Sequence, residues 1–157
     1  MTADLQLPPP PEPAAHYLPW VTNGDLVYLA GQTPKEGNVL IHSGRLGRDL
    51  DVTQGQAAAR LCALRLLSAL QAAAGSLDQV ERVLRLTVFI NAEDGFTDHP
   101  IVANGASDLV VQALGARGTH VRSAVGVSSL PGNAAVEVEM TAQLRRPQAG
   151  SNAKIQE

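Results

Sequence analysis

Apolar residues recur along the middle of this chain in short runs and in helical spacing. Residues 26–30 form a short apolar run that meets Gly31 and Pro34, and residues 39–41 form a second run. Glycine and proline mark turns, so this pattern predicts two strands joined as a hairpin. Residues 80–91 alternate or run apolar, which indicates a strand in the centre of a sheet.

Two segments carry helical signals. Thr53 and Gln56 have the spacing of a capping box, and they precede apolar residues that recur close to every 3.6 positions, namely Ala58, Leu61, Cys62, Leu66, Ala69, Leu70 and Ala73. Gly75 is expected to end this helix. A second helix is predicted over about 100–114 and is stopped by Gly115, although Gly105 within it is unfavourable by about 1 kcal/mol.

The last part of the core reads as two more strands, 121–129 and 136–145, paired as a hairpin through residues 130–133. The second strand alternates, with five apolar residues on one face: Val136, Val138, Met140, Ala142 and Leu144. The predicted order is β-β-α-β-α-β-β. We therefore expect an α+β domain in which both helices cover one face of a mixed sheet.

The two ends differ from the core in composition. Residues 8–13 hold five prolines, so residues 1–16 are predicted to form an extended arm that can lie across a surface or a neighbouring subunit. Residues 146–157 are polar and are expected to be a flexible tail. The length of 157 residues fits one domain, which we place at 17–145.

Charge and cysteine content narrow the function classes. The formal net charge is -3 and the 12 basic residues are scattered, which argues against a nucleic-acid partner or an anionic membrane surface. No apolar run approaches the roughly 18 residues that span a bilayer, and the amino terminus does not read as a secretion signal. The single cysteine, Cys62, is expected to be a buried structural thiol and suits a cytoplasmic location.

Charged residues on the apolar strands of the 122–139 segment suggest chemistry. Arg122, Glu137 and Glu139 lie where a core strand would carry apolar side chains, which indicates a salt-bridged interface or a pocket for a charged ligand. A sheet covered on one side must also bury its other face, and neither face of the 122–127 strand is uniformly polar. Self-association with closed symmetry would bury that face and create pockets between subunits.

Residues 17–143 resemble the Rid family, also called YjgF-like and often described as endoribonuclease L-PSP. The motifs that carry the resemblance are Gly31-Gln32 followed by Pro34, Gly75-Ser76-Leu77-Asp78-Gln79-Val80, Val88-Phe89-Ile90, Asn104-Gly105-Ala106-Ser107-Asp108-Leu109, Arg122-Ser123-Ala124-Val125, and Leu130-Pro131 leading to Val136-Glu137-Val138-Glu139. The resemblance implies a chorismate-mutase-like fold and a homotrimer with three clefts between subunits. It also implies hydrolysis of α-keto acid imines, of the 2-aminoacrylate and 2-iminopropanoate type, to the keto acid and ammonia, without a metal or cofactor.

The resemblance also implies site residues. Arg122 falls at the position that anchors the substrate carboxylate, and Glu137 at the position that orients the hydrolytic water. Four further positions match the substrate pocket: Tyr17 and Asn104 by their side chains, Gly31 and Ala124 by their backbone. Ala30 stands where the deaminases carry a pocket serine, so this sequence lacks that hydroxyl.

Other interpretations stay open at this point. Arg122 and Glu137 could pair with each other in a subunit interface, Tyr17 could simply anchor the arm, and Asn104 could cap a helix. His120 shares a strand face with Arg122, where a structural role is favoured over a ligand contact. The loss of the hydroxyl at Ala30 favours an alternative function, a trimeric protein that binds or senses small carboxylate metabolites without catalysis.

Overall fold

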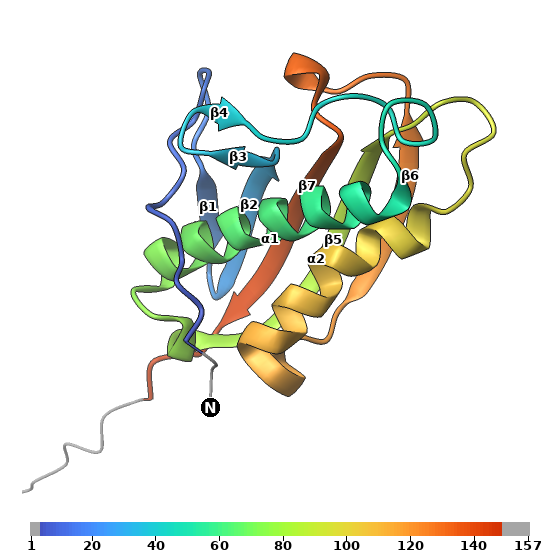
Figure 1. Cartoon of the computed structure of the whole chain (residues 1–157). Coiled ribbons are helices and arrows are strands. Elements are labelled where there is room, and N and C mark those ends of the chain that lie inside the picture. The colour runs from blue at the N-terminus through green and yellow to red at the C-terminus, as the bar shows by residue number, and fades with distance from the viewer. Residues whose placement is uncertain (1–3, 149–157) are drawn as a thin grey trace, which may run out of the picture.

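The computed structural model describes residues 4–148 as a five-stranded mixed sheet with two long helices side by side across one face (Figure 1). The sheet has the spatial order β1-β2-β7-β5-β6, and only the β5–β6 pair is parallel. Its strands are β1 (Trp20–Asn23), β2 (Leu26–Gln32), β5 (Val80–Asn91), β6 (Val121–Val127) and β7 (Val136–Leu144). The predicted α+β class, with both helices on one face, is confirmed.

The remaining elements are the helices and the short connections. The long helices are α1 (Val52–Ala74) and α2 (His99–Leu114), and β3 (Lys35–Glu36) pairs with β4 (Val39–Leu40) in a small separate sheet. Three 3₁₀ turns are η1 (Leu77–Gln79), η2 (Gly115–Gly118) and η3 (Pro131–Asn133).

The first hairpin differs from the prediction. Strand β2 pairs with β1, through a tight turn in which Gly24 has a φ of 62°, and the 39–41 segment pairs instead with β3. Gly24 supplies the left-handed conformation that a two-residue hairpin turn requires. The prediction placed the hairpin turn at Gly31 and Pro34 instead. The predicted pairing of 26–30 with 39–41 is therefore wrong. The order β-β-α-β-α-β-β still describes the main sheet, with β1 and β2 as its first two strands.

The predicted hairpin between 121–129 and 136–145 is also wrong. Strand β6 pairs in parallel with β5 at the sheet edge, whereas β7 lies between β5 and β2. Helix α2 provides the crossover that a parallel pair needs, and η3 then carries the chain past the end of β5. Strands that are adjacent in sequence are therefore separated in space by β5.

The N-cap of helix α1 is Asp51, two residues before the predicted cap Thr53. Asp51 Oδ1 accepts a hydrogen bond from the Gln54 backbone amide at 2.8 Å, and the Asp51 amide donates to Gln54 Oε1 at 2.9 Å. This is a reciprocal capping box, but Asp51 and Gln54 form it in place of Thr53 and Gln56. Gly75 ends the helix as predicted, with a φ of 84°.

Helix α2 closely follows the predicted range of 100–114 and ends at Gly115. Gly105 within it has a packing reason, because a Cβ at this position would collide with the backbone carbonyl of Gln56 on α1. The glycine therefore lets the two helices approach closely, at the expense of helix propensity.

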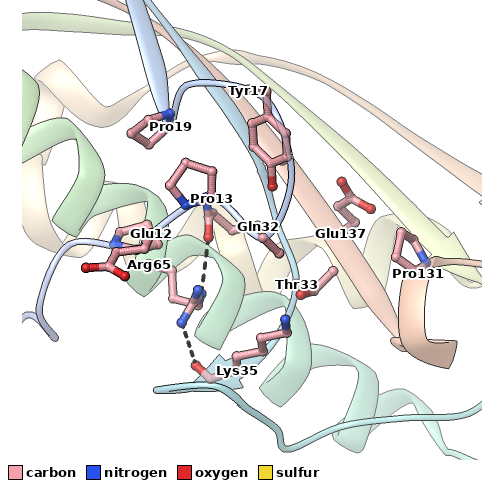
Figure 2. A pocket seen from close by; sticks show the side chains of 13 residues that line it. Glu12, Pro13, Tyr17, Pro19, Gln32, Thr33, Lys35, Arg65, Pro131 and Glu137 are labelled. Atoms are coloured by element: carbon pink, nitrogen blue, oxygen red, sulfur yellow. Dashed lines mark hydrogen bonds between the residues drawn. The ribbon is translucent and has the colours of Figure 1, made fainter.

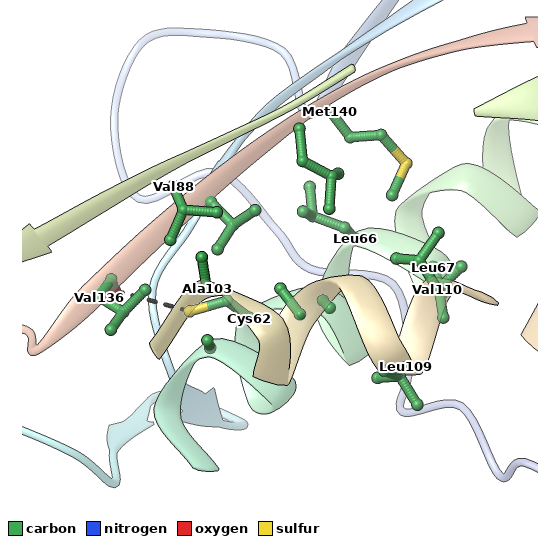
Figure 3. Packing of buried hydrophobic residues seen from close by; sticks show 14 of the residues in the cluster. Cys62, Leu66, Leu67, Val88, Ala103, Leu109, Val110, Val136 and Met140 are labelled. Atoms are coloured by element: carbon green, nitrogen blue, oxygen red, sulfur yellow. Dashed lines mark hydrogen bonds between the residues drawn. The ribbon is translucent and has the colours of Figure 1, made fainter. Parts of the chain in front are cut away.

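The core lies between the helices and the sheet (Figure 3). Cys62, Leu66 and Leu67 of α1 pack with Val88 and with residues of α2 and β7. The Cys62 thiol donates to the Val136 carbonyl at 3.5 Å, and burial raises its pKa, which confirms the expectation of a buried structural thiol.

Helix α1 is long and apolar enough to cross a membrane by length and composition alone, contrary to the expectation that no such run exists. Half of its most apolar window is buried inside the fold. Core packing therefore accounts for its apolar composition.

The described part of the proline-rich arm runs across α1 before it enters β1 (Figure 1). Ser68 of α1 donates its hydroxyl hydrogen to the Pro8 carbonyl at 2.5 Å, and Leu5 and Leu7 pack against the core. Of the predicted tail, residues 149–157 lie outside the described residues.

Candidate functional site

Arg122 lies on β6 at the sheet edge and faces α2. It stands opposite Leu86 of β5, which is fully buried under the helices. Its Nη1 donates to Asn104 Oδ1 at 2.9 Å and to Ser107 Oγ at 3.0 Å, and its Nη2 donates to the Pro100 carbonyl at 3.3 Å. We call Arg122, Asn104 and Ser107 the Arg122 half-site.

Two other predicted residues, Asn104 and Ala124, lie within or next to this half-site. Asn104 is in the second turn of α2, which begins at His99, so the interpretation of Asn104 as a helix cap is wrong. Its side chain holds Arg122 instead. Ala124 lies two residues after Arg122, opposite Val88 on the same strand face, and is partly buried against the core.

Glu137 lies on the other face of the sheet. Val136 and Val138 are buried beneath the helices, so strand alternation directs the residue between them away from the helices. Glu137 stands opposite Phe89 of β5, whereas Arg122 stands opposite Leu86. Among residues 4–148, no ion pair joins Arg122 to Glu137.

Glu137 borders a cavity of about 120 Å³ near the end of β2 (Figure 2). The lining includes the predicted residues Tyr17 and Gly31, together with Gln32, Arg65 and residues 11–14 of the arm. A Cβ at position 31 would collide with Oε1 of Glu137, so Gly31 makes room for the carboxylate. We call Glu137, Gly31 and Tyr17 the Glu137 half-site.

The Glu137 carboxyl is electrostatically unusual. Burial raises its pKa, and the negative charge of Glu139 raises that pKa further. Within the described part of the chain, no group donates a hydrogen bond to this carboxylate. The oxygens are thus open to water or ligand, and the group holds a proton more tightly than an exposed glutamate does. Glu139 therefore influences the proton affinity of this group.

Ala30 precedes Gly31 on β2, and its amide donates to the Pro19 carbonyl at 3.0 Å. Its side chain offers no hydrogen-bonding group, as the sequence indicates. The residue is absent from the cavity lining.

Arg65 is a cavity residue that sequence reasoning missed. It reaches the cavity from α1, where its Nε donates to Gln32 Oε1 at 3.2 Å and its Nη1 donates to the Lys35 carbonyl at 3.3 Å. Burial lowers its pKa. The sequence signal that could have found it is a positively charged residue within a mainly apolar helical repeat. Such a side chain needs a hydrogen-bonding or charged partner when it faces the interior of the protein.

No three histidine, cysteine, aspartate or glutamate side chains gather as a metal site within residues 4–148. His120, which has no metal-ligand neighbours, instead contacts Ser107 of the Arg122 half-site.

Comparison with known proteins identifies the family. Residues 1–144 match the model of a family described as "YjgF/chorismate_mutase-like, putative endoribonuclease". The chain belongs to the YjgF (Rid) family. Membership confirms the resemblance and accounts for the fold.

Relatives in this YjgF family match most of the chain. Protein TCP17 of Trypanosoma cruzi is 47% identical over 141 residues, which cover 89% of this chain and 88% of that protein. The crystal structure of Atu1372 from Agrobacterium tumefaciens superposes with a TM-score of 0.85 at 38% identity and covers 90% of this chain and 87% of that one. RidA from Psychrobacter sp. PAMC 21119 shares the fold, with a TM-score of 0.62 at 23% identity over 90% of this chain and 99% of that one.

Proposed function

We propose that this chain hydrolyses imines and enamines of α-keto acids to the keto acid and ammonia, in clefts between the subunits of a homotrimer. The observation that carries the proposal is that one half-site has a positively charged side chain and the other has a carboxylate. Arg122 offers a fixed cation suited to a carboxylate, and Glu137 offers an open carboxylate with a raised pKa.

The separation of the half-sites favours a site completed by a second copy. Arg122 and Glu137 lie on opposite faces of one sheet, so one small substrate cannot reach both within a single chain. The cavity beside Glu137 is also smaller than the ~300–1,000 Å³ of typical ligand pockets. A neighbour whose β6 edge approaches this cavity would bring its own Arg122 to it.

The sheet face away from the helices suits such an assembly. Val21, Tyr28 and Val125 lie on this face and are each about half exposed in the single chain. Association would bury these apolar side chains, and a closed ring uses the same interface at every contact.

The reaction needs only positioning and proton transfer. Arg122 binds the substrate carboxylate, and a water molecule attacks the carbon of the protonated C=N bond while Glu137 accepts its proton. A C–O bond forms, and Glu137 returns the proton to nitrogen. As the C–N bond breaks and ammonia departs, the new hydroxyl group loses its proton to Glu137 and becomes the C=O group of the keto acid. Burial of Glu137 strengthens its basicity for the first step.

The first test measures ammonia and keto-acid release from imines generated in situ. We expect Glu137→Gln to lower kcat by about 10²- to 10⁴-fold, because it removes the general base. Arg122→Ala should raise KM by about 10- to 100-fold, because a charged hydrogen-bond pair is lost. Arg82→Ala and Glu81→Gln, which change exposed charges elsewhere on the sheet, serve as controls. Wild-type turnover in both site variants would refute the deaminase assignment.

The second test asks whether the two halves come from different subunits. The impaired Arg122→Ala and Glu137→Gln chains are mixed, unfolded and refolded together, sized by light scattering, and assayed at a substrate concentration below the wild-type KM. If each site takes Arg122 from one subunit and Glu137 from the next, about one quarter of all sites are intact after random assembly of an equal mixture of the two chains. Activity should then return to about that fraction of the wild-type level, whereas sites built within one chain would stay inactive.

Ala30 supports a second candidate, a trimeric protein that binds or senses small carboxylate metabolites. Such a protein would keep the Arg122 anchor and lack efficient catalysis, because the serine hydroxyl of the deaminases is missing. Ammonia release that appears only after Ala30→Ser, with carboxylate binding already present in the wild type, would favour this function over the deaminase.

A further inference from the structure

Arg122 is the first member of a chain of hydrogen bonds that extends away from the candidate ligand. Its Nη1 donates to Ser107 Oγ at 3.0 Å, and Ser107 Oγ lies 2.9 Å from Nε2 of His120. The other ring nitrogen of His120, Nδ1, lies 2.6 Å from the Gly118 carbonyl oxygen. The proposed function uses Arg122 but gives no role to Ser107 or His120.

Only one direction of donation satisfies these contacts when the imidazole is neutral. The Gly118 carbonyl can only accept, so His120 Nδ1 must carry the ring hydrogen. Nε2 then has a lone pair and accepts. The guanidinium of Arg122 can only donate, so Ser107 Oγ accepts from Arg122 and its own hydrogen points to Nε2. The backbone carbonyl thereby sets the histidine tautomer and the serine orientation.

This arrangement leaves a defined part of Arg122 for a ligand. A guanidinium has five N–H groups, and three hydrogen bonds to Asn104, Ser107 and Pro100 use two on Nη1 and one on Nη2. Within residues 4–148 the other two, on Nε and Nη2, have no acceptor. The Nε edge of a guanidinium presents one Nε–H and one Nη–H side by side, and such a pair matches the two oxygens of a carboxylate.

We propose that Ser107 and His120 are positioning residues that fix the guanidinium plane of Arg122 and so determine the affinity of the site for carboxylates. The inference rests on the proposed function only for the choice of a carboxylate as the ligand. The fixed orientation of the Arg122 guanidinium does not depend on catalysis. Side chains that are fixed before binding lose less entropy when the ligand arrives, which raises affinity.

A serine next to a histidine could instead be a nucleophile. Two contacts disfavour this interpretation. Ser107 Oγ already accepts from Arg122, and a backbone carbonyl stands where a catalytic triad has a carboxylate to stabilise the charged imidazole. A fluorophosphonate that labels activated serines distinguishes the two roles.

The experiment combines pyruvate binding with nitrogen NMR of the full chain at a pH where the imidazole is neutral. In the wild type we expect a protonated Nδ1 on His120 and separate, slowly exchanging Nη signals from Arg122. Ser107→Ala and His120→Leu should merge the Nη signals and weaken pyruvate binding by about 5- to 10-fold, the loss of one hydrogen bond. With an imine substrate the same variants should raise KM by a similar factor and leave kcat within about twofold.

A conservative variant separates positioning from simple damage to the fold. His120→Gln keeps an acceptor oxygen for the Ser107 hydroxyl and should restore pyruvate affinity to within about twofold of the wild type. Thr119→Ala is the matched control, since it alters the neighbouring residue, whose hydroxyl donates to Ala116, and should leave Arg122 unchanged.

Several results would overturn the inference. These are Nη signals already merged in the wild type, pyruvate affinity unchanged in both Ser107→Ala and His120→Leu, or covalent labelling of Ser107 by the fluorophosphonate. Failure of the deaminase proposal looks different: wild type and variants release no ammonia, yet the Arg122 signals and pyruvate affinity still depend on Ser107 and His120.

Discussion

The Arg122 half-site and the Glu137 half-site differ in what holds their charged groups. Three hydrogen bonds to side chains and backbone hold Arg122, and all three acceptors belong to α2. No described group donates to Glu137, whose place is defined by the close approach of Gly31 and by burial. One group is held by polar contacts and the other by the shape of the space around it.

This difference matches two chemical needs. A carboxylate anchor must keep its charge and its orientation, and hydrogen bonds to a guanidinium serve both. A group that accepts and returns a proton must tolerate both protonation states, and partial burial without hydrogen-bond donors brings those states closer in free energy. Each half-site should therefore respond to a different kind of substitution.

Among substitutions that keep both charged groups, the largest expected effect is at Gly31. In Gly31→Ala the new methyl group must displace the end of the flexible Glu137 side chain, so activity should fall by about 10²-fold, as for a small misplacement of a catalytic group. The melting temperature should change little, because no backbone atom is displaced. Gly126→Ala, which also pushes on a side-chain end, that of His99, is the matched control. Full activity in Gly31→Ala would show that the carboxylate position is unimportant.

Gly105→Ala tests the Arg122 half-site indirectly, because it changes the packing of α2 against α1. Its Cβ would meet the Gln56 backbone of α1, which cannot yield as a side chain does, so we expect a loss of about 1–3 kcal/mol in unfolding free energy. Helix α2 would move together with Asn104 and Ser107, so pyruvate affinity should also weaken. The measurements are denaturant unfolding and calorimetry, and an unchanged midpoint would contradict the close helix contact.

Glu139→Gln tests the electrostatics of the Glu137 half-site. The Glu137 carboxyl must be ionised to accept a proton, so kcat/KM should fall as the pH drops through its raised pKa. Removal of the Glu139 charge lowers that pKa, so the acid limb of the profile should move to lower pH. The pH profile of kcat/KM is the readout, and a shift to higher pH, or none, contradicts the coupling.

The smallest effect is expected from the arm, which lines the Glu137 cavity and leaves the Arg122 half-site untouched. Ser68→Ala removes the hydrogen bond to the Pro8 carbonyl and should cost about 1 kcal/mol of local stability. Hydrogen exchange or limited proteolysis of residues 4–16 should report faster opening, and KM should rise slightly. Unchanged protection of the arm would show that Ser68 does not hold it.

Local patterns predicted the elements well. The run at 80–91 became β5 with the same bounds, and Gly75 and Gly115 end the two helices as expected. Strand pairing was predicted less well, because sequence neighbours were taken as partners. The turn at Gly24 has a local signal, Asn23-Gly24-Asp25, which the prediction overlooked. The insertion of β7 between β2 and β5 depends on long-range pairing that no local signal encodes.

The candidate site divides in the same way. Tyr17, Gly31 and Glu137 come together, as do Arg122 and Asn104, but the two groups face opposite sides of the sheet. Arg65 and Ser107 were missed, because their roles come from contacts with β2 and β6 that lie 33 and 15 residues away in the chain.

The sequence by itself determined the α+β class, the helices with their end points, and the identities of the cation and carboxylate, since these depend on periodicity, caps and residue chemistry within a few positions. The tertiary structure alone decided that β5 separates Arg122 from Glu137 and that a serine and a histidine hold Arg122. Those features arise from pairings between distant segments, whose free energy depends on the packing of the whole sheet against α1 and α2.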